Sequence, residues 1–100
     1  MKVEITQTDN QVLAIIEGRL DTVTSSEFEK TLSPYYAMQG IGLTLDCEAM
    51  KYISSAGLRV VLMTHKNITA KGGTFTIRNL TKEVRSVFDM TGFSRILTIE

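Results

Sequence analysis

Two adjacent hydroxyl side chains, those of Ser54 and Ser55, are the first candidates for chemistry in this sequence. They follow a short polar stretch and precede apolar residues at helical spacing, so we expect them to begin a helix. The first backbone N–H groups of a helix have no partner within the helix, and serine commonly caps them. On the local sequence alone, capping is the stronger interpretation, and any chemistry of the chain is expected within residues 46–62.

A serine enzyme is a poor match to the residues around this pair. A nucleophilic serine needs a base within hydrogen-bond reach, and the only histidine, His65, lies about 15 Å from Ser55 along the predicted helix. His65 is better interpreted as a solvated or packed imidazole. The Gly-x-Ser-x-Gly pattern is absent, as are the glycine patterns that bind phosphates of nucleotides. We therefore expect a protein that is not an enzyme and that has no cofactor and no metal.

Composition and charge indicate one soluble domain spanning residues 1–100. The chain is 43% hydrophobic and 22% charged, which suits a single core at this length. Its 11 basic and 11 acidic residues give a net charge of zero, without the bulk attraction that binders of nucleic acid or anionic membranes use. We expect no nucleic-acid partner, no membrane partner and a monomer when the protein is free.

The cysteine count and the N-terminal pattern favour the cytoplasm. Cys47 is the only cysteine, so no internal disulfide forms and no cysteine pair can hold zinc. We expect Cys47 to behave as a small buried hydrophobe rather than as a reactive thiol. Residues 1–7 alternate between apolar and polar and lack the apolar run of a signal peptide, and no segment is long enough to cross a bilayer.

The chain begins with the pattern of a β-hairpin. Residues 2–6 alternate between polar and apolar, as in a strand with one solvated face. Residues 12–16 form a continuous apolar run, which predicts a strand buried on both faces that ends before Gly18. The Asp-Asn turn at residues 9–10 makes the two strands antiparallel.

A helix and a third strand follow. Asp21 is one of several N-cap candidates for the helix, and Pro34 should kink or restart it before Gly40. Residues 41–45 alternate and predict a strand that delivers Asp46 to its carboxyl end, with a short polar loop leading to the serine pair.

The remaining elements complete an α/β order. They are a helix from Ser54 with Leu58, Val61, Leu62 and Ile68 on its core side, a stop at 71–73, a strand at 74–78, a helix from Thr81 to Gly92 and a strand at 96–99. The order β-β-α-β-α-β-α-β predicts a single-domain α/β fold with a mixed sheet and helices packed on it. Functional groups of such sheets gather beyond the carboxyl ends of the strands, where Asp21, Ser54 and Ser55 should meet.

Four segments together carry a resemblance to a known family. They are Gly-Arg-Leu-Asp at 18–21, residues 45–62 with Tyr-Ile-Ser-Ser-Ala-Gly-Leu-Arg-Val-Val-Leu, Lys-Gly-Gly at 71–73, and residues 84–96 with Val-Arg-Ser-Val-Phe-Asp-Met-Thr-Gly-Phe. With this spacing, over nearly the whole chain, the sequence resembles bacterial anti-sigma factor antagonists of the STAS domain family.

The resemblance implies a partner-switching protein. In the family, an anti-sigma factor that is also a serine kinase, with a histidine-kinase-like ATPase domain, phosphorylates the antagonist, and a serine phosphatase reverses the reaction. The unmodified form binds the kinase and the phosphorylated form releases it. Carried onto this sequence, the acceptor is Ser55, because the other hydroxyl position is Ala56. Ser54 replaces the family's frequent aspartate and is the second candidate.

The implied partner surface includes residues with simpler explanations as well. It consists of Asp21, Ser54, Ala56, Gly57 and Arg59. Asp21 can be only an N-cap, and Gly57 can simply permit close packing between helix and strand. Arg59 lies one turn into the helix, where it can contact a phosphate or a carboxylate of the partner.

Two further points bear on this interpretation. Many relatives continue into another C-terminal helix, whereas this sequence stops at Glu100 after the last predicted strand, so we expect one flank of the core to be barer or covered by a partner. The alternative function is a STAS-type interaction without phosphorylation, or a small-ligand or nucleotide-binding module in a larger signalling complex. Which output is controlled depends on the partner.

Overall fold

A five-stranded sheet organises the chain, and its elements follow the predicted order. The computed structural model describes residues 1–100. The elements are β1 (Lys2–Thr8), β2 (Gln11–Leu20), α1 (Thr22–Leu32), β3 (Gly42–Ile53), α2 (Ser55–Ala70), β4 (Thr74–Arg78), α3 (Lys82–Met90) and β5 (Thr98–Ile99), with short 3-10 turns η1 (Ser33–Ala37) and η2 (Phe93–Arg95). The expected α/β fold with a mixed sheet is confirmed.

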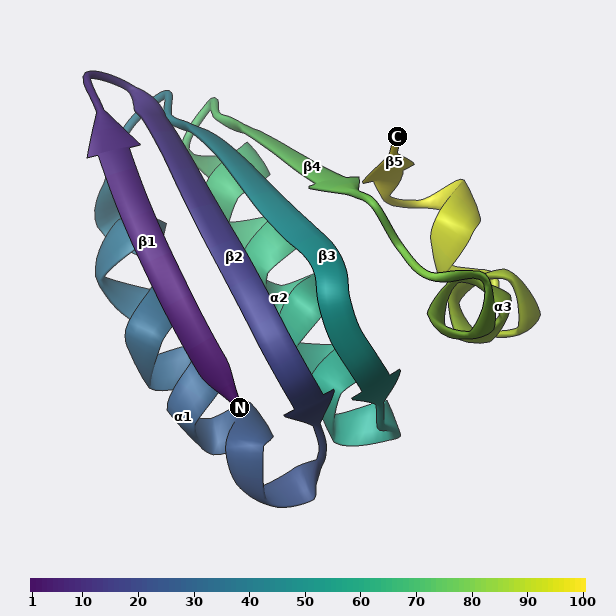
Figure 1. Ribbon diagram of the computed structural model, residues 1–100. Coiled ribbons are helices and arrows are strands. Elements are labelled where there is room, and N and C mark those ends of the chain that lie inside the picture. Colours follow the sequence, from purple (N-terminus) through teal and green to yellow (C-terminus); the bar gives the residue numbers. More distant parts are fainter.

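The strands lie in the order β1-β2-β3-β4-β5. The first pair is antiparallel, as the hairpin pattern predicted, and each later pair is parallel. Helices α1 and α2 cover one face of the sheet, while α3 packs beside β3, past the carboxyl end of β4 (Figure 1). No helix is long and apolar enough to span a membrane.

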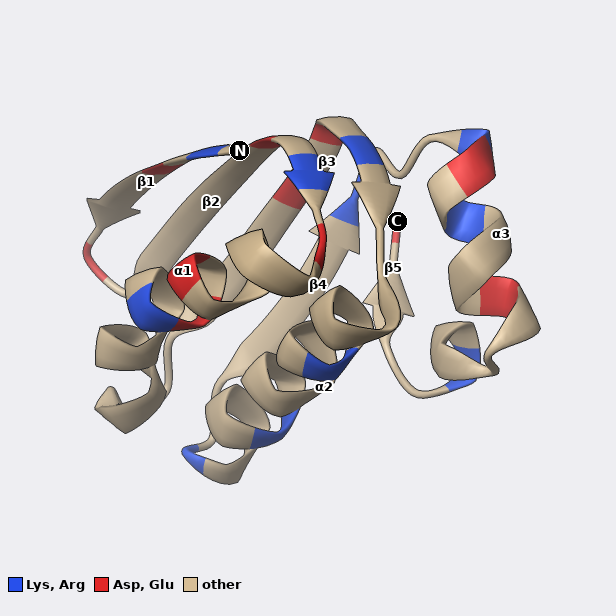
Figure 2. Ribbon diagram, turned by 90° about the horizontal axis from the view of Figure 1, so that it is seen from below, with Lys and Arg blue, Asp and Glu red and all other residues tan.

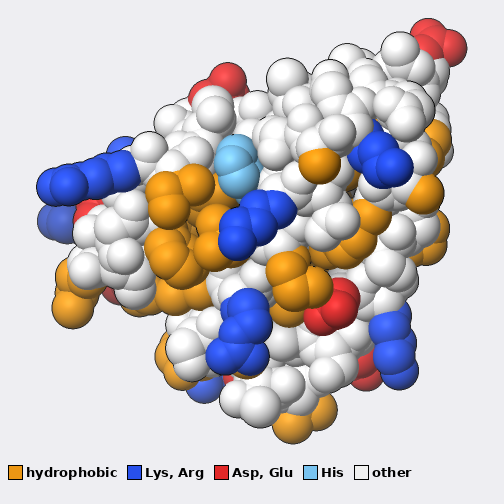
Figure 3. Space-filling view, turned by 180° about the vertical axis from the view of Figure 1, so that it is seen from behind, with side chains coloured by type: hydrophobic (Ala, Val, Ile, Leu, Met, Phe, Trp, Pro, Cys, Tyr) orange, Lys and Arg blue, Asp and Glu red, His pale blue; other side chains and the backbone are white.

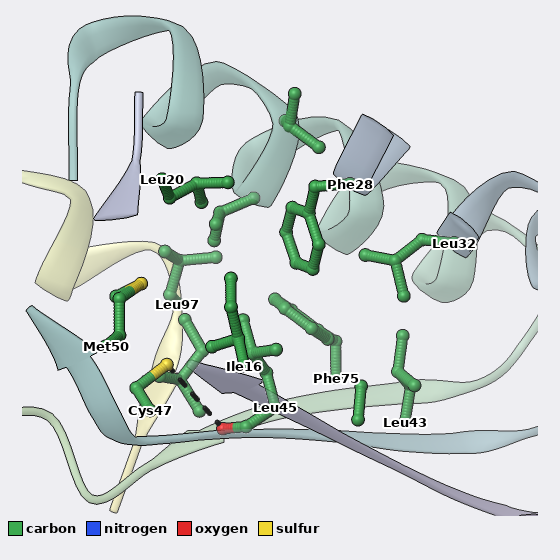
Figure 4. Close-up of a cluster of buried hydrophobic side chains, with 14 of the residues drawn as sticks. Ile16, Leu20, Phe28, Leu32, Leu43, Leu45, Cys47, Met50, Phe75 and Leu97 are labelled. Atoms are coloured by element: carbon green, nitrogen blue, oxygen red, sulfur yellow. Dashed lines mark hydrogen bonds between the residues drawn. The ribbon is translucent and has the colours of Figure 1, made fainter. Parts of the chain in front are cut away.

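The core lies between the sheet and the two covering helices. Figure 4 shows Phe28 and Leu32 of α1 directed toward Ile16, Leu45 and Phe75 of the strands, and all five side chains are buried. Burying a side chain of this size is worth about 1.5–3 kcal/mol relative to leaving it exposed, so these contacts hold the helices onto the sheet.

The prediction that residues 12–16 are buried on both faces is wrong. Val12, Ala14 and Ile16 are buried, whereas Leu13 and Ile15 between them are partly exposed. The reason is that α1 and α2 pack on a single face, so side chains alternate between core and solvent. The continuous apolar run therefore marks a strand with one covered face.

Two strands extend further than predicted. β2 continues through Gly18, which adopts φ +96, and β3 continues from Gly42 to Ile53. Residues 48–52, expected to form a polar loop, are strand residues because the extended β2 pairs with them. Asp46 consequently lies within β3 and not at its carboxyl end, which corrects its predicted place.

The predicted helix boundaries are close to those observed. Pro34 lies at the start of η1, which confirms the restart after α1. Thr81 caps α3 by accepting a hydrogen bond from the N–H of Val84 at 3.2 Å, and Gly92 follows α3 with φ +80. The last strand is shorter than predicted: β5 contains only Thr98 and Ile99, and residues 96 and 97 come before it.

Candidate functional site

The carboxyl ends of β2 and β3 bring two distant segments together. The strands are parallel, and Leu20 at the end of β2 pairs with Ile53 at the end of β3. The next residues, Asp21 and Ser54, therefore leave the sheet side by side, and the N–H of Ser54 donates a hydrogen bond to the carbonyl of Leu20 at 2.8 Å. Both α1 and α2 begin at this edge (Figure 1). The predicted meeting of Asp21 with the serine pair is confirmed, and we call this region the serine edge.

The two serines of the serine edge have different surroundings. Ser54 is the N-cap of α2, and its Oγ accepts a hydrogen bond from the N–H of Gly57 at 3.1 Å. Ser55 is the first residue of the helix and is exposed, and its hydroxyl makes no hydrogen bond. The cap predicted from the sequence is thus made by Ser54, which leaves the hydroxyl of Ser55 free.

Asp21 is the N-cap of α1. Its Oδ1 accepts hydrogen bonds from the N–H groups of Val23 at 3.1 Å and Thr24 at 3.0 Å. The Oγ1 of Thr24 accepts in return from the N–H of Asp21 at 2.8 Å, which closes a capping box. These hydrogen bonds hold the pKa of Asp21 below its ordinary value, and the bond from the backbone N–H of Thr24 has the largest effect. The capping interpretation is confirmed, and a contact between Asp21 and a partner stays a prediction.

Gly57 lies where α2 meets the ends of two strands. A Cβ atom at this position would stand 2.9 Å from side-chain atoms of Ile53 and Leu20 and 3.0 Å from the carbonyl oxygen of Leu20. Such contacts are too short, so glycine is the residue that lets the start of α2 approach the sheet. The packing role of Gly57 is confirmed. Gly57 is buried, and its contact with a partner stays a prediction.

Ala56 and Arg59 line a shallow groove between α1 and α2 that starts at the serine edge. The groove measures about 220 Å³, and its other lining residues are Thr22, Ser25, Ser26, Glu29, Val60 and Met63. Arg59 is exposed and takes part in no ion pair or hydrogen bond. Within α2 every ionisable side chain is basic or a histidine, and the helix shows no acidic position (Figure 2).

Two exposed apolar side chains near this edge were not predicted from the sequence. Val23, in the first turn of α1, is 77% exposed, and Tyr52, at the end of β3, is 40% exposed. The guanidinium of Arg19 lies 4.1 Å from the centre of the Tyr52 ring in a cation–π contact. Val23 could have been found, because it lies off the helical spacing of the core residues Phe28 and Leu32.

Asp46 stabilises the region where β3 lies beside the end of β4, away from the serine edge. Its carboxylate accepts hydrogen bonds from the N–H of Glu48 at 3.1 Å and from the side chain of Asn79 at 3.2 Å, and it pairs with Arg78 at 3.4 Å. Desolvation raises the pKa of Asp46, but these hydrogen bonds and the charge of Arg78 outweigh it, so the pKa lies below its ordinary value. Asp46 thereby links β3 to the end of β4.

Cys47 and His65 contribute no chemistry to the serine edge. Cys47 is buried, as predicted, and burial raises the pKa of its thiol to about 12, far above the range of reactive thiols. His65 is partly buried, and its ring centre lies 6.4 Å from that of Phe75, so the packed interpretation is confirmed. No three side chains of His, Cys, Asp or Glu form a group that could hold a metal ion.

Comparison with known proteins connects this geometry to a family. The STAS domain family matches residues 2–100. BtrV of Bordetella bronchiseptica, which carries the name of an anti-sigma factor antagonist, is 30% identical over 99 residues that cover 99% of this chain and 85% of BtrV. The anti-sigma-B factor antagonist of Bacillus subtilis is 29% identical over 99 residues, covering 99% of this chain and 90% of that protein.

Solved structures agree with this match at the level of the fold. The anti-sigma factor antagonist SpoIIAA in its unphosphorylated form superposes with a TM-score of 0.84 at 19% identity, covering 99% of this chain and 88% of that chain. The phosphorylated form of SpoIIAA, from Bacillus, gives a TM-score of 0.76 at 18% identity, covering 99% and 91% of the two chains.

Proposed function

Since the chain belongs to the STAS domain family, we propose that it is an anti-sigma factor antagonist whose partner binding is controlled by reversible phosphorylation of Ser55. The partner is a serine kinase that is also an anti-sigma factor, and a serine phosphatase restores the unmodified form. The unmodified form binds the kinase, and the phosphorylated form releases it. Residues 1–100 form one STAS domain that acts in the bacterial cytoplasm.

The observation that carries the choice of Ser55 is the difference between the two serines. The Oγ of Ser54 is engaged in capping α2, where it accepts from the N–H of Gly57. The hydroxyl of Ser55 is exposed on the first turn and has no partner within the chain. A kinase can therefore reach the Ser55 hydroxyl without opening the helix, whereas modification of Ser54 would remove the cap.

The relatives support the rest of the proposal. Two curated relatives are named as anti-sigma factor antagonists and match along nearly the whole chain. SpoIIAA, which shares the fold, is known in an unphosphorylated and a phosphorylated form. These names describe the relatives. We extend the antagonist function to this chain because its exposed Ser55 lies at the edge where two parallel strands end.

Electrostatics explains why a phosphate would switch binding without unfolding the domain. A phosphate adds about 1.5–2 negative charges, which free N–H groups at the start of a helix tolerate well. A partner that packs against the small surface of Ser55 and Ala56 would instead desolvate an unpaired charge, at a cost of several kcal/mol by order of magnitude. Phosphorylation therefore acts locally on the interface.

The deciding experiment is phosphorylation by a candidate kinase from the same genome. The protein would be co-purified with the kinase and incubated with ATP, and its intact mass and phosphopeptides measured. We expect one phosphate on Ser55, none in the Ser55→Ala variant, and one in Ser54→Ala. A protein that never gains a phosphate, or gains it anywhere other than on Ser55, would defeat the assignment.

A catalytic role for Ser55 is the competing explanation, and the same variant separates the two. Turnover of any substrate panel that disappears in Ser55→Ala would show that the serine is a nucleophile. We expect no such turnover, because His65 lies about 15 Å further along α2 and no other imidazole exists in the chain.

A further inference from the structure

Arg59 is a cation without a partner beside the proposed phosphorylation site. The ion pairs of the structure join Lys2 with Glu4, Arg78 with Asp46, and Arg85 with Asp89, and none includes Arg59. The face that carries α1 and α2 displays both Lys or Arg and Asp or Glu side chains (Figure 3). Glu29 lines the same groove as Arg59, but no ion pair joins the two side chains, so the guanidinium is free to bind another anion.

The helix directs Arg59 toward Ser55. The two residues are separated by one turn, at positions i and i+4 of α2, and such positions are neighbours on a helix surface. Side chains of a helix slope toward its N-terminus, so a residue covers the turn that precedes it. The guanidinium of Arg59 accordingly lies within reach of a phosphate on Ser55, and an anion followed by a cation at i+4 is the favourable arrangement.

Arg59 also borders the surface that a partner would contact. It lines the groove between α1 and α2 together with Ala56, Met63 and Glu29, which places a guanidinium without an ion pair next to small and apolar side chains. Such a surface suits a partner segment that presents a carboxylate beside an apolar group, because the charges are complementary and the groove accepts the apolar part.

We propose that Arg59 exchanges partners when Ser55 is phosphorylated. It binds a carboxylate of the partner protein in the unmodified form and the phosphate of Ser55 in the modified form. Phosphorylation then removes a favourable contact at the interface in addition to placing a new charge there. This inference rests on the proposed function, since it assumes that Ser55 is the acceptor.

The first test needs no kinase. Phosphoserine would be installed at position 55 by genetic encoding, and the pKa of its phosphate followed by phosphorus NMR. A nearby guanidinium favours the dianion and lowers this pKa, so Arg59→Gln should raise it by roughly 0.3 pH units. Lys66→Gln removes the same charge further along α2 and should leave the pKa unchanged. An equal effect of both variants, or none from Arg59→Gln, would overturn the proposal.

The second test measures the exchange itself. Affinity for the kinase would be measured by calorimetry for the unmodified and phosphorylated forms of the wild type and of Arg59→Gln. We expect Arg59→Gln to weaken the unmodified form about tenfold and the phosphorylated form by less than twofold, with partial rescue by Arg59→Lys. An equal loss in both forms, or no loss in the unmodified form, would show that Arg59 does not couple the phosphate to binding.

The two tests separate this inference from the function on which it rests. If the kinase leaves Ser55 unmodified while the phosphate at position 55 still responds to Arg59→Gln, the proposed function fails and the ion pair stands. If the kinase modifies Ser55 but the phosphate does not respond to Arg59→Gln, the proposed function stands and the exchange fails.

Discussion

Two polar side chains, that of Asp46 within β3 and that of Ser55 at the start of α2, differ in their hydrogen bonds. Asp46 is 9% exposed, and its carboxylate accepts hydrogen bonds from Glu48 and Asn79 and pairs with Arg78. The hydroxyl of Ser55 is exposed and has no partner within the chain. The difference separates a polar group that is satisfied within the fold from one that is free at the surface. A polar group whose bonds are satisfied holds the fold, whereas one that is exposed and unpaired is available to another protein.

The largest expected effect is on the Asp46 side of this comparison. Asp46→Ala should lower the free energy of unfolding by about 2–3 kcal/mol, because hydrogen bonds to a charged group and the side-chain link from β3 to the end of β4 are lost. Urea unfolding followed by circular dichroism measures this. Glu48→Ala, on an exposed neighbour, should change stability by less than about 0.5 kcal/mol. Equal effects of the two variants would contradict the assigned role of Asp46.

The pH dependence of stability sharpens the same point. The pKa of Asp46 in the folded protein lies below the ordinary value of 3.8, so the folded state binds this proton less readily than the unfolded chain. Its contribution is therefore complete above pH 3.8 and is lost as the pH falls through the lower folded value. Urea unfolding of the wild type and of Asp46→Asn between pH 6 and about pH 2 should converge at the acid end. A constant difference would show that the charge of Asp46 is not what stabilises the fold.

The next effect concerns the start of α2. Alanine is the better helix former by about 1 kcal/mol, yet its Cβ at position 57 would collide with Ile53 and Leu20. Since the neighbours include the backbone carbonyl of Leu20, which cannot turn away, Gly57→Ala should destabilise the protein by about 1–3 kcal/mol in urea unfolding. A stabilised variant would mean that the helix end can move away from the sheet.

The third effect separates the two serines by stability. Ser54→Ala removes the side-chain cap of α2 and should cost about 1 kcal/mol, whereas Ser55→Ala removes a hydroxyl without a partner and should change stability by less than about 0.5 kcal/mol. Thermal unfolding of the two variants under one buffer condition gives the comparison. A larger loss for Ser55→Ala would reverse the roles assigned to the two hydroxyls.

Caps and element order could be predicted from the sequence because they depend on local side-chain chemistry. Asp21, Ser54 and Thr81 are each followed by free N–H groups that the side chain can reach, and all three cap helices as their positions suggested. The meeting of the β2 and β3 ends follows from the same order, because parallel neighbouring strands end at one edge of the sheet.

The length of β3 could not be predicted in the same way. Its second half, residues 48–52, is mixed in polarity and reads as a loop, and it is a strand only because β2 continues past Gly18 to offer hydrogen bonds. That partner is distant in sequence. The exposure of Val23 and the stacking of Arg19 on Tyr52 depend equally on tertiary placement. Local patterns therefore located the serine edge but not the surface around it.

The smallest effect on stability, with the clearest effect on binding, is expected from Ser55→Asp. An acidic residue in the first turn of a helix is favourable, so the variant should unfold at the wild-type denaturant concentration or slightly above it. Binding to the kinase, measured by calorimetry, should weaken at least about tenfold because the new carboxylate would be desolvated in the interface.

Ser55→Asn is the matched control for this prediction, because asparagine has the size of aspartate without its charge. If Ser55→Asn binds nearly as well as the wild type while Ser55→Asp does not, the negative charge at position 55 is what weakens binding of the partner. If both variants bind equally weakly, the partner senses the bulk of the side chain, and the phosphate would act through size. If both bind as tightly as the wild type, the partner does not contact Ser55, and the contrast between the satisfied carboxylate of Asp46 and the free hydroxyl of Ser55 would lose its functional meaning.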